Sequence, residues 1–265
     1  LTLENGQEVV KALEELHRHH SLPPLEPRIL SFAVMSDTVD TFTFARFSLQ
    51  PDRFQEYITS RDPKTGLTML GVACSLGCLS IVKYLLSLCY VSRNAPSMPN
   101  QSNFAVFSHL QDSTSDAILP STLRVLSGGR TPAGDTLLTL ALKGGHEAVA
   151  WHLLLALPPS TVEPGAMNED HMTALMYACE AGYERIVEFL LRTDCGALQR
   201  PTDGRTVLHM AAANVHVEIV NLLIAQHGAW LVAYPDFAGA TAYDLVQASP
   251  AATAAVRAQL LASLA

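Results

Sequence analysis

Closely spaced histidines and cysteines are the residues of this sequence whose types could do chemistry. His17, His19 and His20 end a segment of helical periodicity, and Cys74 and Cys78 lie four residues apart. Imidazole and thiolate groups are ligands that zinc prefers. No second cysteine pair follows at a comparable spacing, and histidines are favourable at a helix C-terminus without any ligand. We therefore interpret both groups as structural, and we expect no metal and no other cofactor.

Motifs that position catalytic or phosphate-binding residues do not occur in the sequence. It contains no G-x-G-x-x-G, G-x-x-x-x-G-K-[ST], H-E-x-x-H or G-x-S-x-G pattern, so neither a phosphate-binding loop nor a known nucleophile or zinc motif is predicted. An enzyme would need an active site assembled from residues that form no recognisable pattern. We therefore expect a protein without catalytic activity.

The composition limits the classes of protein that fit. Of 265 residues, 49% are hydrophobic and only 7% are aromatic, as expected for helices that pack through Leu, Val and Ala. The formal net charge of −8 argues against a nucleic-acid partner, and no apolar run reaches the roughly 20 residues of a membrane span. Five cysteines without a disulfide pattern, and an N-terminus without a signal pattern, favour the cytoplasm or nucleus.

One stretch, residues 203–224, explains how the rest of the chain is organised. It reads DGRTVLHMAAANVHVEIVNLLI. A turn signal is followed by Thr206, whose hydroxyl is well placed to cap a short helix. A small apolar helix and a second helix with an Ile/Val/Leu stripe come next. Two such short helices cannot bury their apolar faces alone, so the unit needs copies of itself on either side.

Copies of this unit recur at nearly constant spacing. The capping threonines are separated by 68, 37, 33 and 35 residues, and 68 is twice 34. They are Thr68, Thr136, Thr173, Thr206 and Thr241. In the second helices, the apolar stripe predicts that Leu190 and Leu222 are buried between neighbouring repeats.

The repeat resembles the ankyrin repeat, whose period is about 33 and whose signature is T-P-L-H-x-A. Residues 206–211, TVLHMA, depart from this signature only at the proline position. Histidine occupies its signature position only in this copy, so the family's Thr–His hydrogen bond is expected once. The resemblance implies an all-α fold, an α-solenoid of stacked helix pairs with short hairpin fingers.

The resemblance also divides the chain. Residues 1–60 are expected to form an N-terminal helix over 4–20 and a degenerate capping repeat, in which residues 52–58 take the place of the second helix. Residues 61–265 are expected to form the array. Its repeats are predicted at about 62–89, 92–129, 130–160, 167–199, 200–232 and 236–265. The repeat at 92–129 is degenerate, and a looped insertion over 90–129 is the alternative.

Members of this family bind partners along the concave side, through finger tips and first helices. The resemblance therefore implies a scaffold or adaptor for protein–protein interaction; a regulatory segment of a larger kinase, acyltransferase or channel is the alternative, since the chain begins with Leu1 rather than Met. The acidic residues favour a basic protein or peptide partner, and we expect a monomer that is not inserted into a membrane. The positions that repeat packing does not demand are Lys64, Thr65, Leu67, Asp135, Lys143, Asn168, Glu169, His171, Glu180, Thr202, Asp203, Arg205, Asn214 and Phe237.

Overall fold

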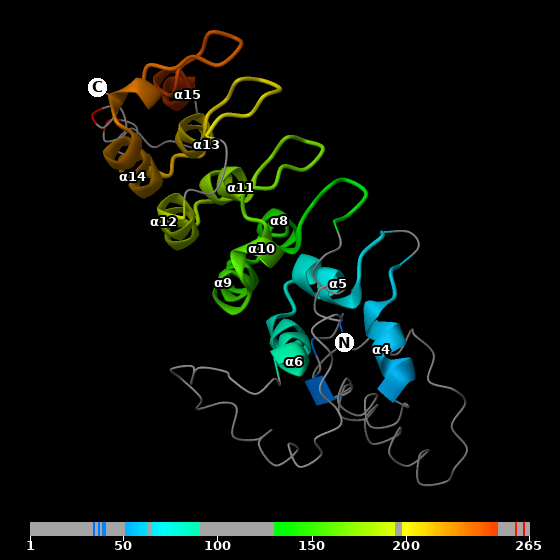
Figure 1. The fold of residues 1–265 in the computed structure, drawn as a ribbon. Coiled ribbons are helices and arrows are strands. Elements are labelled where there is room, and N and C mark those ends of the chain that lie inside the picture. Colours follow the sequence, from blue (N-terminus) through cyan, green and yellow to red (C-terminus); the bar gives the residue numbers. More distant parts are fainter. Residues whose placement is uncertain are drawn as a thin grey trace. The chain divides into compact units, whose positions relative to one another are not determined.

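The computed structural model forms two compact units, Leu1–Gly129 and Arg130–Ala265, shown in Figure 1. The structure describes residues 34, 37, 39–40, 51–62, 65–90, 130–193, 198–248, 258 and 262. The predicted helix over 4–20, the segment 91–129 and most of 251–264 lie outside the described residues. The choice between a degenerate repeat and an insertion at 90–129, and the domain boundary at residue 60, therefore stay predictions.

The second unit is a stack of helix pairs, which confirms the predicted all-α solenoid. First helices follow one another in one row, α8 against α11, α11 against α13 and α13 against α15; second helices α9, α12 and α14 form another row. Its described part contains no strand, only an isolated bridge between Gln199 and Thr206. The helices are α8 Leu137–Lys143, α9 Glu147–Ala156, α10 Pro159–Val162, α11 Ala174–Ala181, α12 Glu184–Arg192, α13 Val207–Ala213, α14 Val217–His227, the 3-10 helix η2 Ala229–Leu231 and α15 Ala242–Ala248.

The first unit contains the helices α4 Pro51–Thr59, α5 Met69–Leu76 and α6 Leu79–Tyr90 among its described residues. Helices α5 and α6 form a pair, as predicted for the repeat at 62–89. Helix α4 covers the segment predicted to be the second helix of the capping repeat, and it packs against the first helix α5. The thiol of Cys78 donates to the carbonyl of Val34 (2.9 Å), so its hydrogen bond is structural.

Threonine capping starts each first helix, as the spacing predicts. In α5, α8, α11 and α13 the threonine side chain accepts a hydrogen bond from the amide three residues later, which satisfies an N–H that has no partner inside the helix. Thr241 accepts in the same way from the amide of Asp244 (3.4 Å). The 37-residue interval between Thr136 and Thr173 holds the extra one-turn helix α10, which accounts for its excess length.

Leucines at a fixed distance from the cap form the buried spine. The leucine 17 residues after the threonine is fully buried in four repeats: these are Leu85, Leu153, Leu190 and Leu223. Leu222 is only half-buried, so its predicted burial between repeats was wrong. The error is one residue of register: the apolar face of α14 contains Ile219, Val220 and Leu223, and Leu222 lies at its edge.

A left-handed residue closes each first helix, nine positions after the capping threonine. Three repeats place glycine there, at Gly77, Gly145 and Gly182, with φ between 76° and 84°. The fourth places Val215 there with φ 67°. A β-branched side chain in this region is strained because its Cβ crowds the backbone.

We expect Val215→Gly to raise the free energy of unfolding by about 1 kcal/mol, because relief of a strain of roughly 1–2 kcal/mol exceeds glycine's entropic cost. Urea unfolding measures the change. The reverse exchange, Gly182→Val, should destabilise the protein, since a Cβ there would lie 2.6 Å from the ring of His216. A lower unfolding midpoint for Val215→Gly would contradict the prediction.

Candidate interaction surface

The hairpin fingers are of two kinds. In the narrow fingers, 131–135, 168–172 and 236–240, the first residue's N–H bonds to the last residue's carbonyl at 3.1, 3.2 and 2.8 Å. The side-chain oxygen of that first residue also accepts from the last residue's amide, at 2.9 Å in all three. One residue type, Thr, Asn or Asp, thus closes the turn twice.

The wide fingers, 62–67 and 200–205, contain one more residue. Their closing bonds run from Asp62 to Leu67 (2.9 Å) and from Arg200 to Arg205 (2.8 Å). The residue that would donate in a narrow finger is a proline in both, Pro63 and Pro201. Because proline has no N–H, the preceding residue donates instead and the finger widens.

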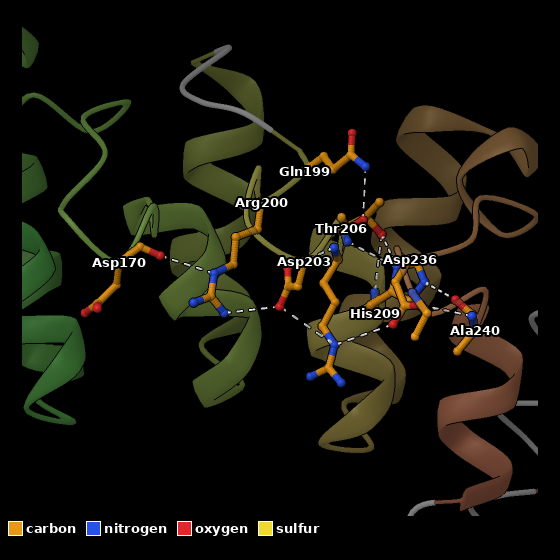
Figure 2. Close-up of polar contacts among 11 residues, drawn as sticks. Asp170, Gln199, Arg200, Asp203, Thr206, His209, Asp236 and Ala240 are labelled. Carbon is orange, nitrogen blue, oxygen red and sulfur yellow. Dashed lines mark hydrogen bonds and ion pairs between the residues drawn. The ribbon is translucent and has the colours of Figure 1, made fainter.

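Neighbouring fingers of the second unit are tied together. The amide of Glu169 donates to the carbonyl of Ala133 (2.8 Å), and the amide of Phe237 donates to that of Asp203 (2.9 Å). At the intervening junction a side chain makes the connection. Arg200 donates from Nε to the carbonyl of Asp170 (3.2 Å) and from Nη1 to the carboxylate of Asp203 (3.3 Å), as Figure 2 shows.

A buried polar network joins the fingers 131–135 and 168–172. The side-chain amide of Asn168 donates to the carboxylate of Asp135 (2.7 Å) and to the hydroxyl oxygen of Tyr177 (3.0 Å). Lys143 lies 3.7 Å from the carboxylates of both Asp135 and Asp170. Burial acts to lower the pKa of Lys143, but Tyr177, Asp135 and Asp170 outweigh this and raise it.

This network corrects one expectation from the sequence. Asp135 and Asn168 were expected to be free of any packing role, but both are buried and hydrogen-bonded to each other. Lys143 is exposed, yet it is committed to two carboxylates. In the free protein, these residues therefore stabilise the fingers.

A second network, centred on His209, joins the next two fingers (Figure 2). The ring lies within 2.7 Å of the Thr206 hydroxyl through Nδ1, which confirms the expected Thr–His bond. The Thr206 amide also points to Nδ1 (3.2 Å), so Nδ1 accepts and Nε2–H donates to the carbonyl of Ala240 (3.1 Å). Arg205 lies beside this ring network, 3.7 Å from the carboxylate of Asp236.

The neutral ring of His209 predicts that stability falls in acid. Burial lowers the pKa of His209 below its ordinary value, so between the two pKa values the unfolded chain binds the additional proton and stability rises with pH. This destabilisation is absent above the unfolded pKa, about 6.5, and grows as pH falls through it.

His209→Thr supplies the control for this effect, because Thr139 forms the same reciprocal cap with Thr136 and does not titrate. We expect the wild type to lose up to about 1 kcal/mol relative to this variant between about pH 7.5 and about pH 5.5. Urea unfolding at both values measures the difference. Parallel pH profiles would contradict the prediction.

The remaining predicted residues line the fingers and first helices. Thr65, Glu169, His171, Glu180, Thr202, Arg205, Asn214 and Phe237 are exposed, Leu67 and Asp203 are half-buried, and Lys64 lies outside the described residues. Four tip residues share one register, four positions before the capping threonine, and all are exposed. They are Pro132, Glu169, Thr202 and Phe237.

His171 has left-handed geometry at a finger position where other repeats place glycine. Its φ is 57°, whereas Gly134, Gly204 and Gly239 occupy the equivalent position with φ of 73° to 82°. Three surface residues were not predicted: Arg200, whose role follows from Pro201, and the exposed aromatics Trp230 and Tyr234.

Comparison with known proteins agrees with this geometry. A family model described as ankyrin repeats (3 copies) matches residues 117–199 and 137–235. The chain belongs to the ankyrin repeat family. Proteins built from these repeats generally mediate protein–protein interaction. A comparison with curated proteins gave no match.

Two searches of the described residues bear on other functions. Among these residues, no helix has both the length and the apolar character to span a membrane. The same part of the chain holds no group of three His, Cys, Asp or Glu side chains arranged to bind a metal ion.

Proposed function

We propose that this chain is a non-catalytic scaffold or adaptor that binds a partner protein through its finger tips and first helices. One observation carries the proposal. The spine position 17 residues after each cap is leucine and buried, whereas the tip position four residues before it is exposed and differs in every repeat of the second unit. Packing explains the first pattern and leaves the second available for recognition.

The charges on this surface favour a basic partner, over a narrower region than the sequence suggests. Asp135 and Asp170 share Lys143, which offsets their charge. Glu169 and Glu180 are exposed, and neither carboxylate forms an ion pair with another described residue. Unpaired exposed carboxylates on finger and first helix complement a Lys- or Arg-bearing segment.

The test is a charge reversal on the proposed surface. Glu169→Lys with Glu180→Lys should reduce capture of partner proteins from a cell lysate, quantified by mass spectrometry, while the free energy of unfolding changes by no more than about 0.5 kcal/mol. Glu188→Lys on α12 is the matched control, since it reverses an exposed charge on a second helix. Unchanged capture with reduced stability would refute the assignment.

Three finer points are part of the same proposal. A cytoplasmic or nuclear location is supported by the buried free thiols of Cys74, Cys78 and Cys179. A monomer is supported by the exposed positions 258 and 262, which carry only small alanine side chains. A regulatory segment of a larger protein would use the same surface, and the full reading frame distinguishes the two.

A further inference from the structure

Phe237 is the most exposed large apolar side chain among the described residues, at 69%. Its position is nevertheless fixed. Its amide is bonded to Asp203 (2.9 Å), and the carboxylate of Asp236 accepts from the next amides of its finger at 2.9 Å. The ring lies against Gly204, where an added Cβ would come within 2.4 Å of a ring carbon. A ring held in place loses little entropy when a partner covers it.

Two further aromatic side chains extend this surface. Trp230 is 55% and Tyr234 38% exposed, and their rings meet edge to face with centroids 6.2 Å apart. The Tyr234 hydroxyl donates to the side-chain oxygen of Gln199 (3.4 Å), and the Gln199 amide donates to the carbonyl of Gly204 (3.1 Å), the residue under Phe237. We call Trp230, Tyr234 and Phe237 the aromatic patch.

Exposed aromatic groups of this kind are costly in water and mark interaction surfaces. Tyr and Trp are also the residues that most often dominate binding energy. The occupant of the patch therefore presents an apolar side chain.

Charge distinguishes the two ends of the tip row. Close to the aromatic patch, Arg200 and Arg205 carry positive charge held by Asp203 and Asp236. Two fingers away, the exposed Glu169 carboxylate has no ion pair among the described residues. A basic side chain of the occupant is therefore favoured at Glu169 and disfavoured beside the patch.

The register of the fingers sets the distance between these anchors. Glu169 and Phe237 occupy the same tip position in repeats separated by one intervening repeat, whose tip residue is Thr202. Packed helices lie about 10 Å apart, so the two tips are separated by about 20 Å. An extended chain advances about 3.3 Å per residue, which corresponds to about six residues.

We propose that the partner presents an extended segment with an apolar side chain on the aromatic patch and a Lys or Arg about six residues away at Glu169. This inference rests on the proposed function and specifies the chemistry of the bound segment. The segment passes over Thr202, whose exposed position leaves room for the intervening residues.

Synthetic peptides carrying one Phe and one Arg separated by two to nine Ser or Thr residues test the spacing. The full chain, labelled with nitrogen-15, is titrated with each peptide, and the backbone amide shifts give the affinity and the site. We expect the tightest binding at about five intervening residues, with shifts at both Phe237 and Glu169. Replacing the peptide Arg by Glu should weaken binding about tenfold or more.

Two variants assign the anchors. Phe237→Ser should remove the preference for a peptide containing Phe, and Glu169→Gln should remove the preference for Arg. Glu188→Gln on α12 should change neither. Affinity that does not depend on spacing, shifts at other surfaces, or no shifts at millimolar peptide would each overturn the inference. The proposed function would still stand if the charge reversal reduced partner capture, because a folded partner can bind without this segment.

Discussion

Leu223→Ala is expected to lower the free energy of unfolding by about 2–5 kcal/mol, because a fully buried side chain leaves a cavity that its neighbours fill only partly. Helix α14 packs against both α12 and α13, so the loss affects two interfaces. Leu222→Ala removes the same atoms one position earlier, where the side chain is half-buried. That variant should cost about 1 kcal/mol or less.

Urea unfolding of the two variants, followed by circular dichroism, measures this contrast. Leu190→Ala should resemble Leu223→Ala, since both leucines lie 17 residues after a capping threonine and both are fully buried. In a stack whose units interact only with their neighbours, either loss can divide unfolding into two transitions. Equal losses for Leu222→Ala and Leu223→Ala would mean that the spine has been assigned to the wrong face.

The helix pairs could be predicted because their signals are local. A threonine hydroxyl satisfies an amide three residues away, and an apolar stripe repeats every three or four residues, so one window of sequence contains both partners. The error at Leu222 arose where two leucines are adjacent and the stripe alone does not choose between them. Counting from Thr206 would have resolved it, because the interval from cap to spine is constant.

The finger positions could be predicted from the same register, but their chemistry could not. Asp135 and Asn168 are 33 residues apart, and their bond exists only because successive repeats stack. The roles of Thr139 and Asp244 were also missed. Each makes the bond that His209 makes in its own repeat, since any acceptor at this position can receive the cap amide.

Local signals for the remaining features were present but were not used. Pro201 lacks an N–H, which predicts the widened finger and a different connection at that junction. Val215 and His171 stand where other repeats have glycine, so strain was detectable by aligning the copies. The exposure of Trp230 and Tyr234 had no such signal, because it depends on how the segment after α14 returns to the next finger.

Asn168→Ala is expected to lower the free energy of unfolding by about 2–4 kcal/mol, although this residue first resembled a surface contact. The side chain donates to Asp135 and Tyr177 and accepts from the amide of Met172. Its loss leaves the Asp135 carboxylate buried with only Lys143 beside it. An unsatisfied buried group costs about 1–3 kcal/mol, and a charged one costs more.

Asn214→Ala is the matched control, because this asparagine is exposed and donates a single bond, to the carbonyl of Met210. It should cost no more than about 0.5 kcal/mol. Hydrogen exchange should then show whether the loss at Asn168 is local: we expect faster exchange at the amides of Glu169 and Met172, which belong to the affected finger. If both alanine variants are equally stable, the network between the fingers contributes nothing to the fold, and Asp135 and Asn168 return to the set of candidate partner contacts.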